Sequence, residues 1–464
     1  MRNKHSVNII FSFLPGIISI FVTFFSIPIY LNYFDNDTYA NYLIQHFILT
    51  LGMILSLQLG KIASINIQTV GKRERENLIY TTLILSIILG SILSGICLFF
   101  INFFLESKNF ISVGFSLFIG IVLTIIYINL EYISRGLSYF KETSLSNLSF
   151  YSLSISLPGF LIFTDIDKNF IVINLFNISL AIKVISILFL LILLIKKKVL
   201  INAKINLKLT HKFYFHSKWM TLTSFYTQIY DYFDKHLIKI YFGSLLLITY
   251  SIPQQIAAKL TIISSAIISV ILPKLSAAKN DKNKKKTLTA NLYLFIYLSS
   301  FLILIFLPFY ENILNWWLKD GYQIKILKLF ELFLLATFLG SCSNILVSMY
   351  EANSIAKKNT ILETYSIFPF LIGLFVSIHY ENIYFFVFVI ILKEFILLSF
   401  RIFELRAFIL NYKILIFQIL FFSTIFFFIY IENFYFVYIN IIILIIISLL
   451  NIPVNILKNE FSKK

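Results

Sequence analysis

The sequence predicts an all-α, polytopic membrane protein of about fourteen transmembrane helices, arranged as two six-helix lobes plus a C-terminal helix pair. Hydrophobic residues make up 59% of the 464 residues, charged residues only 13%, and the mean hydropathy is +0.87. A soluble chain would carry about 25% charged residues. Apolar runs of about 20 residues, the length that spans a bilayer as a helix, recur along the whole chain. These runs are unbroken, whereas the strands of a membrane barrel alternate over about 10 residues.

The predicted spans follow one another with short connections. The first is a retained helix rather than a cleavable signal peptide, because its apolar run is too long and no small-residue cleavage site follows it. In chain order the spans are 6–31, 42–61, 79–104, 110–131, 146–163, 170–195, 219–242, 249–273, 288–309, 326–349, 360–378, 383–403, 411–431 and 434–456.

The distribution of basic residues predicts the orientation of the spans. Most of the 39 Lys and Arg fall in alternate connections, beginning with Arg2 and Lys4, and the other connections are short and acidic, as in "TDIDKN". Because basic loops stay cytoplasmic, both termini are expected on the cytoplasmic side. Nucleic-acid binding is disfavoured, since the basic residues are scattered over many short loops. The basic residues expected in outer loops are Lys108, Lys168, Lys319 and Lys325.

The sequence lacks the residues that disulfides, metal sites and phosphate-binding loops require. Cys97 and Cys342 lie in apolar surroundings, which supports neither a disulfide framework nor a thiolate metal site. The six histidines are dispersed without ligand spacing, and "GKRERE" at 71–76 lacks the leading glycine and the hydroxyl of a phosphate-binding loop. We therefore expect no cofactor, no metal and no nucleotide hydrolysis by that route.

A basic linker divides the chain. The segment 196–218 is rich in lysine and is expected to lie on the anionic cytoplasmic leaflet. The third span of each half follows a similar charged stretch, "GKRERENL" at 71–78 and "DKNKKKTL" at 281–288. Repeated halves of this kind frame a central substrate site. The predicted domains are a lobe at 1–195, the linker at 196–218, a lobe at 219–405 and the additional pair with a basic tail at 406–464.

Three stretches carry a family resemblance. "PIYLNYFDNDTYANYLI" (28–44), "YFDKHLIKIYFGSLLLITYSIPQQIAAKL" (232–260) and "ILPKLSAAKND" (271–281) resemble polysaccharide (O-antigen and lipid-linked oligosaccharide) flippases of the multidrug/oligosaccharidyl-lipid/polysaccharide (MOP) exporter superfamily. The second stretch is the most specific, with an acid-base pair and a turn at Gly243. The glycines and basic residue often found near the end of the first helix in that family are replaced by Asn32, Ala40 and Asn41.

The resemblance implies a two-lobed transporter that opens alternately inward and outward. Its substrate would be a glycan linked to undecaprenyl diphosphate, moved from the cytoplasmic to the outer leaflet of a bacterial cytoplasmic (inner) membrane. Expected partners are the lipid-linked oligosaccharide, membrane lipids, a coupling H⁺ or Na⁺ and a glycan polymerase. In lipid II flippases of the superfamily a similar extra helix pair borders a lipid-tail groove.

Charged residues inside the predicted spans are the candidate site. Each costs about 2.5–3.5 kcal/mol at a helix centre, so these side chains should face protein or water. Lysines in a cavity would bind phosphate, and amides would bind sugar hydroxyls. The candidate substrate-binding residues are Lys61, Arg135, Lys183, Lys235, Gln255, Lys259 and Lys393. The candidate ion-coupling residues are Asp231, Asp234 and Glu394.

The sequence leaves the partners of these charges open. Asp231 and Lys235, four residues apart on a helix, either line a wet cavity or pair with each other. Asp234 is then the surplus acid, which binds a coupling cation or pairs with another lysine. Lys393 and Glu394 are adjacent, point about 100° apart and need not pair. The acids Glu131, Glu331 and Glu363 lie near predicted span ends.

Three functions compete at this point, beside a purely structural membrane subunit. The first is export of a lipid-linked oligosaccharide. The second is export of an amphipathic drug or another lipid by the same fold. The third, a membrane glycan polymerase or ligase, is disfavoured because the longest predicted outer loop, 310–325, is too short to hold two glycans.

Overall fold

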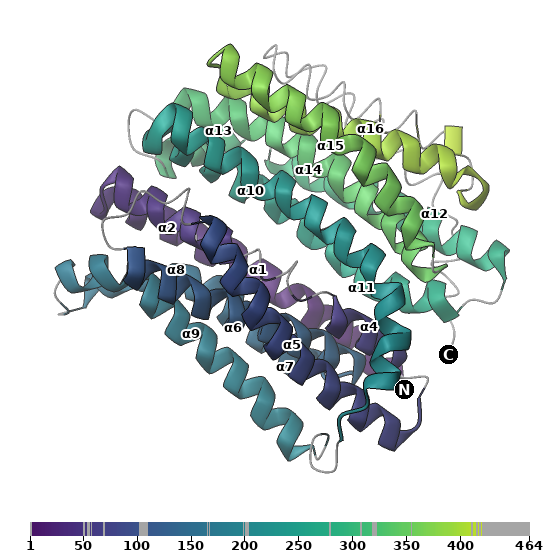
Figure 1. Ribbon diagram of the computed structural model, residues 1–464. Coiled ribbons are helices and arrows are strands. Elements are labelled where there is room, and N and C mark those ends of the chain that lie inside the picture. Colours follow the sequence, from purple (N-terminus) through teal and green to yellow (C-terminus); the bar gives the residue numbers. More distant parts are fainter. Residues whose placement is uncertain are drawn as a thin grey trace. The chain divides into compact units, whose positions relative to one another are not determined.

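The computed structural model describes most of residues 2–419, and every regular element among them is a helix (Figure 1). The predicted all-α class is confirmed. The predicted span 434–456 and most of 411–431 lie outside the described residues. Within 2–419 the residues that the structure does not describe are 50–51, 53–55, 57, 68–69, 102–109, 165, 167, 198, 200–203, 278–279, 307–308, 318–322, 354, 410–411, 414–415 and 417–418.

The chain divides into two compact units. Unit 2 comprises Ile10–His236, and unit 1 comprises Met1–Ile9 together with Leu237–Lys464. The division falls inside a helix, α10, whereas the sequence predicts a domain boundary at the linker 196–218. That linker is helical from Leu207 onward. The predicted domain limits stay a prediction.

The helices of unit 2 begin with α1, most of which belongs to this unit. They run, in chain order, as α1 (Arg2–Tyr33), α2 (Asn36–Leu49), α4 (Leu59–Asn66), α5 (Lys72–Ile101), α6 (Phe110–Gly136), α7 (Phe140–Asn147), the π-helix η1 (Leu148–Leu153), α8 (Ser154–Phe160), the 3₁₀ turn η2 (Leu161–Phe163), α9 (Lys168–Lys196) and the first part of α10 (Leu207–Ala257).

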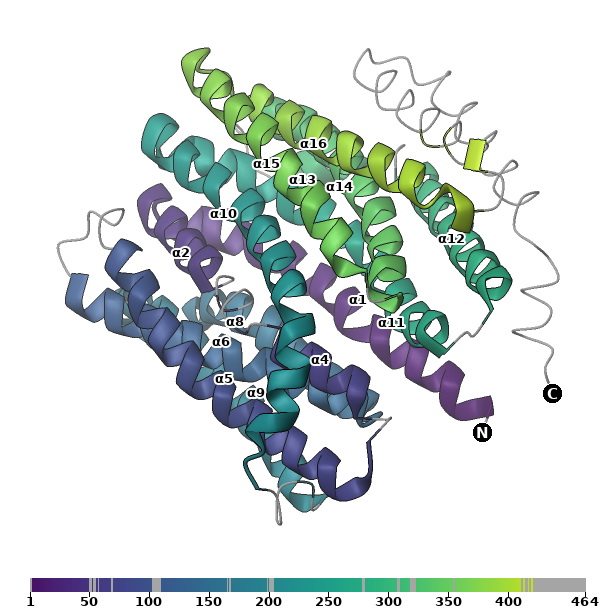
Figure 2. The ribbon, with the colours of Figure 1, turned by 45° about the vertical axis from the view of Figure 1, so that its right-hand side comes forward.

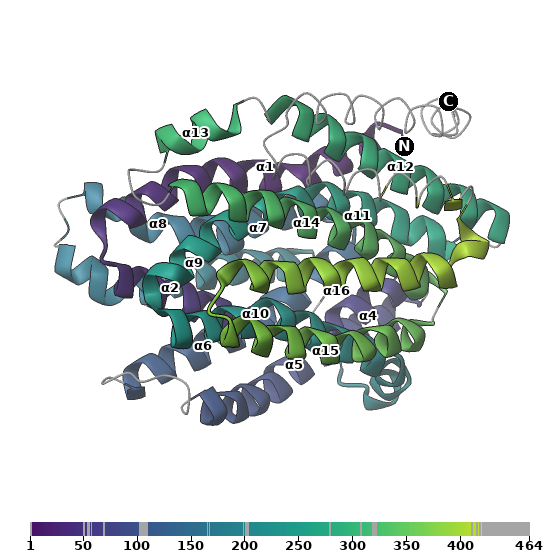
Figure 3. The same ribbon diagram turned by 90° about the horizontal axis from the view of Figure 1, so that it is seen from above.

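The helices of unit 1 begin with the rest of α10. They continue as the 3₁₀ turn η3 (Ala258–Leu260), α11 (Thr261–Ala277), α12 (Asp281–Phe306), α13 (Tyr310–Trp317), α14 (Gln323–Ala352), α15 (Ala356–His379), α16 (Ile383–Glu404) and the 3₁₀ turn η4 (Arg406–Phe408). Helices α15 and α16 lie side by side, as Figure 3 shows from above.

Ten helical stretches of the described residues are long and apolar enough to cross a membrane. Their exposed faces fit that role. On α15, Tyr365, Phe368, Ile372 and Phe375 are 62–71% exposed and follow one another at helical spacing. So many large apolar side chains on one face require lipid to cover them. The chain is therefore a multi-pass membrane protein.

Each unit has a hydrophobic core of its own. In unit 2 the core joins α4, α5, α6 and α9 through residues such as Ile79, Leu130 and Leu190. In unit 1 it joins α11, α12, α14 and α16 through residues such as Phe295 and Phe338. The interiors are thus apolar, and each buried polar group in them needs a reason.

Helices α4 and α6 approach closely because Gly60 has no side chain. A Cβ at Gly60 would lie 2.6 Å from the Cα atom of Asn129. The Gly60 N–H donates to Oδ1 of Asn129 at 2.5 Å, and Nδ2 of Asn129 donates to the carbonyl of Ile125 at 2.9 Å. One turn on, Ser64 meets Gly136 just as tightly. Small residues at this spacing are typical of helix contacts in membranes.

The α7–α8 segment and helix α10 each contain an irregular turn. The α7–α8 segment widens into the π-helix η1, and such turns occur frequently at functional sites. In α10 the backbone leaves the helical region at Gly243, where φ is 83° and ψ is 176°. Only glycine adopts this conformation readily. The helix break at Gly243 is the turn predicted there from the sequence.

Candidate functional site

A series of buried polar side chains runs through unit 2, starting from Lys183 on α9. Lys183 is 5% exposed, and its Nζ lies 4.8 Å from the ring centroid of Phe150. Phe150 comes from the π-helix and stacks on Tyr127 of α6, with 3.6 Å between centroids. An ammonium over an aromatic face is stabilised electrostatically, more so when water is excluded. The π-helix therefore supplies the platform on which a buried cation rests.

Tyr127 leads from this platform into a hydrogen-bonded cluster around Glu131. The Tyr127 hydroxyl donates to Oδ1 of Asn147 at 2.5 Å, and Nδ2 of Asn147 donates to Oε1 of Glu131 at 2.8 Å. The Arg135 guanidinium lies 2.6 Å from the same carboxylate oxygen, and the Tyr151 hydroxyl is 3.4 Å from the other. The charge of the predicted substrate ligand Arg135 is thus already matched by a carboxylate one helical turn away.

Helix α2 connects Lys183 to a second buried lysine, Lys235. Nε2 of His46 on α2 lies 3.4 Å from the hydroxyl of Ser179, which precedes Lys183 by one turn of α9. The next residue, Phe47, places its ring centroid 4.7 Å from Nζ of Lys235, which is 5% exposed. Helix α9, which carries Lys183, therefore packs against α2 at His46, the residue before the phenylalanine whose ring lies beneath Lys235. Each of the two lysines has an aromatic ring beneath it.

Asp234 is the acid that pairs with Lys235. It is 0% exposed, its Oδ1 accepts the backbone N–H of Lys235 at 2.6 Å, and the same oxygen lies 3.6 Å from Nζ of Lys235. The sequence left open whether Lys235 pairs with Asp231, whose side chain lies outside the described residues. A fully buried carboxylate next to a buried ammonium costs stability unless the hydrogen-bonding needs of both are met, which makes this pair a candidate for function.

The remaining candidates lie apart from this series. In unit 1, Nζ of Lys393 lies 2.7 Å from Oε1 of Glu394, so the expectation that these neighbours need not pair is wrong. Their long side chains curl toward each other although their Cα–Cβ bonds diverge. Gly340 leaves the space that the Glu394 carboxylate fills. Three candidates are half-buried: Gln255 on α10, Lys259 on η3 and Lys61 on α4.

A buried ion pair in unit 1 was missed by sequence reasoning. Arg401 of α16 is 2% exposed, donates from Nε to Oδ1 of Asn359 at 2.9 Å, and bonds Ser343 and Glu363 through its other nitrogens. These partners belong to α14 and α15, so one guanidinium connects three helices. Helices α14, α15 and α16 pack against one another in unit 1 (Figure 2). The available signal was a charge at each of two predicted span ends. No metal-ligand cluster of His, Cys, Asp or Glu occurs among the described residues.

Comparison with known proteins now adds to this geometry. No family model matches the chain. A putative O-antigen transporter of Shigella flexneri is 26% identical over 160 residues, which cover 34% of this chain and 38% of that protein. A MOP superfamily transporter from Pyrococcus furiosus superposes with a TM-score of 0.64 at 14% identity, over 88% of this chain and 96% of that one. The chain has the MOP transporter fold.

A second MOP structure agrees. The outward-facing form of a multidrug resistance MATE family transporter has a TM-score of 0.61 at 15% identity, over 86% of this chain and 96% of that one. The resemblance to the MOP superfamily that the sequence predicts is confirmed.

Proposed function

We propose that this MOP-fold chain translocates an undecaprenyl-diphosphate-linked oligosaccharide from the cytoplasmic to the outer leaflet of a bacterial cytoplasmic membrane. It does so by alternating access, driven by an H⁺ or Na⁺ gradient, with both termini cytoplasmic. The similarity to a protein named as an O-antigen transporter and the resemblance in residues 28–44 and 232–260 support this substrate class. All three proteins described above are named transporters, which supports a role without catalysis.

The observation that carries the proposal is the pair of buried lysines around α2. An ammonium held at 5% exposure costs stability, and a chain under no other demand would place an apolar residue there. Lys183 and Lys235 each rest on an aromatic ring, which holds the cation in place without neutralising it. Such cations suit a diphosphate, which offers several anionic oxygens.

Asp234 supplies a means of coupling. Its carboxylate already attracts the Lys235 ammonium, and a proton or Na⁺ arriving at that carboxylate would weaken the attraction. Lys235 would then hold a phosphate more strongly, so cation binding and substrate binding at this site would be linked. The other proposed substrate contacts are Lys61, Arg135, Gln255, Lys259 and Lys393, and Asp231 and Glu394 are the other proposed coupling acids.

The test replaces the chromosomal gene by variants and measures surface glycan with a lectin or antibody. Lys235→Ala and Lys183→Ala are each expected to lower display by about ten-fold or more, since a hydrogen bond to a charged group contributes about 1.5–3 kcal/mol. Lys239→Ala, one turn further along α10, is the matched control and should display normally. Immunoblots of the membrane fraction confirm equal insertion. Normal display by both single variants and by the double variant would remove these lysines from the mechanism.

A drug exporter is the second candidate, because a solved neighbour is described as a multidrug resistance transporter. Two measurements in reconstituted vesicles separate the functions. Flipping of an undecaprenyl-diphosphate-linked sugar that depends on Lys235 supports the first. Efflux of a cationic dye without lipid flipping supports the second. The coupling role requires that Asp234→Asn flips the lipid at a rate that no longer responds to an imposed proton or sodium gradient.

A further inference from the structure

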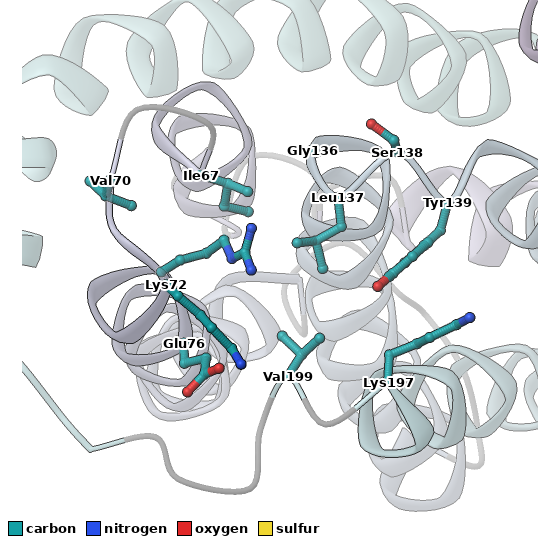
Figure 4. A pocket seen from close by; sticks show the side chains of 11 residues that line it. Ile67, Val70, Lys72, Glu76, Gly136, Leu137, Ser138, Tyr139, Lys197 and Val199 are labelled. Atoms are coloured by element: carbon teal, nitrogen blue, oxygen red, sulfur yellow. The ribbon is translucent and has the colours of Figure 1, made fainter. Parts of the chain in front are cut away.

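A pocket of about 500 Å³ opens in unit 2 where α4, α6 and α9 end and α5 and α7 begin. We call it the loop pocket. Its walls come from the turn after α4, the first turns of α5, the α6–α7 connection and the end of α9 (Figure 4). It is lined by Ile67, Val70, Lys72, Arg75, Glu76, Gly136, Leu137, Ser138, Tyr139, Lys197 and Val199.

The loop pocket is cationic. Three basic side chains line it, Lys72, Arg75 and Lys197, against the single carboxylate of Glu76. Figure 4 shows Lys72 and Lys197 on different walls, with Tyr139 beside Lys197. Helix α5 starts at Lys72, so the positive end of a 30-residue helix adds to the potential there. Lysines from separate helices repel one another, which favours an anion between them.

Arg75 gives the strongest indication that the loop pocket binds a ligand. Its Nε atom is buried, and within the described part of the chain no group hydrogen-bonds it. A buried donor without a partner costs about 1–3 kcal/mol, so such atoms usually mark a missing ligand or water. The backbone N–H of Arg75 is already used, because it donates to the carbonyl of Gly71 at 2.9 Å. The guanidinium fork matches two oxygens of a phosphate.

The opposite wall is fixed by backbone geometry. Ser138 has a φ of 67°, a conformation uncommon outside glycine, which turns the chain sharply after α6. The turn is closed by N–H groups of Ser138 and Tyr139 that donate to Arg135 and Ser134, both at 2.9 Å. Nζ of Lys197 lies 5.8 Å from the Tyr139 ring centroid. The pocket therefore has a preformed wall rather than a collection of loose lysines.

We propose that the loop pocket binds a phosphate monoester or diester, carried by an anionic lipid headgroup or by a soluble phosphorylated metabolite. Its volume falls within the roughly 300–1,000 Å³ that small ligands occupy. The stretch "GKRERE" at 71–76 has no hydroxyl for a nucleotide-bound metal, but it contributes Lys72, Arg75 and Glu76 to this pocket. The site lies within unit 2 and does not depend on which substrate the chain transports.

The test compares two arginines on the same helical turn. Arg75→Gln removes the pocket guanidinium, and Arg73→Gln removes one that is exposed and does not line the pocket. Full-length protein is prepared in nanodiscs of phosphatidylcholine with and without phosphatidylglycerol. Native mass spectrometry counts the phosphatidylglycerol molecules retained. Titration calorimetry in pure phosphatidylcholine discs measures binding of inorganic phosphate and of glycerol 3-phosphate.

Arg75→Gln is expected to weaken binding by about ten-fold or more in one of the two arms, since it removes a charge-assisted bond. Arg73→Gln should stay within about two-fold of the parent. Loss confined to the lipid arm identifies a headgroup, and loss in the calorimetric arm identifies a soluble phosphate. Equal binding by the two variants in both arms would overturn the proposal. Should Arg75→Gln fail to fold, Lys197→Gln against Lys196→Gln gives the same comparison from another wall.

Discussion

Replacing Glu363 by Gln should destabilise unit 1 severely, because it leaves the Arg401 guanidinium without a counter-charge. Arg401 is 2% exposed at the side chain and Glu363 7%, so water cannot take the place of the carboxylate. Breaking a buried pair by removing one partner costs about 3–5 kcal/mol. Asn359 and Ser343 still accept from Arg401, but neither carries a charge. We therefore expect a loss in that range.

Unit 1 offers a matched control in the pair between Lys358 and Glu404. Their charged atoms are 3.2 Å apart, but the side chain of Lys358 is 59% exposed. An exposed pair contributes about 0–1 kcal/mol, so Lys358→Gln should change the free energy of unfolding little. Arg401→Met with Glu363→Leu should cost less than the sum of the two single changes, since no buried charge is then unmatched.

The assay is unfolding by sodium dodecyl sulfate in mixed micelles, followed by tryptophan fluorescence. Each variant is titrated at several protein concentrations, and the midpoint and slope give the apparent free energy of unfolding. The reasoning is refuted if Glu363→Gln lowers the free energy of unfolding by no more than Lys358→Gln does. A double variant as unstable as the summed single variants would show that the ion pair is not coupled.

Two further predictions concern the start of α2 and the break in α10. The Thr38 hydroxyl and N–H donate to Asp35 at 2.6 and 2.9 Å and hold the pKa of that carboxyl below its usual value. Asp35→Ala should therefore cost about 1 kcal/mol at pH 7. That difference should shrink as the pH falls through the lowered pKa of the folded state, since the stabilisation needs the ionised form, and melting curves at pH 7 and below pH 4 measure it. Gly243→Ala should cost about 1–3 kcal/mol because of its positive φ, although no atom lies within 4 Å of an added Cβ. Gly95→Ala has the same open space in a regular helix and should be neutral or stabilising, so equal melting temperatures for the two glycine variants would contradict the strain argument.

The spans were predictable because membrane insertion is a local property of the sequence. A run of apolar residues is read one stretch at a time, and each of the ten apolar helical stretches overlaps a predicted span. Among the described residues, however, no such stretch covers the predicted span 42–61, and one stretch, Phe233–Ile268, overlaps both 219–242 and 249–273. The turn at Gly243 was also readable, since a glycine between two apolar runs suggests a conformation that other residues avoid. The helical start of α10 at Leu207, inside the predicted linker, was not. The lysines of that segment predicted a basic linker, but a high lysine content does not exclude a helix.

The partners of the charges were less predictable than their depth. Lys183, Lys235 and Lys393 are buried, as their positions in the spans indicated. The acid with which a lysine pairs depends on the rotation of both side chains. The Cβ directions of Lys393 and Glu394 diverge, yet their long side chains form an ion pair. Arg401 was missed because its partners are 38 to 58 residues away. Distances of that kind come only from packing.

The first turn of α4 is capped by a side chain from another helix, α6. Its preceding residue, Gln58, makes no side-chain bond to the helix, and the N–H that such a bond would satisfy, that of Gly60, is taken by Asn129, 69 residues later in the chain. During synthesis the ribosome therefore releases α4 well before the amide that completes it. The first turn of α4 should stay frayed until α6 has been inserted, which makes this contact a late step in the assembly of unit 2.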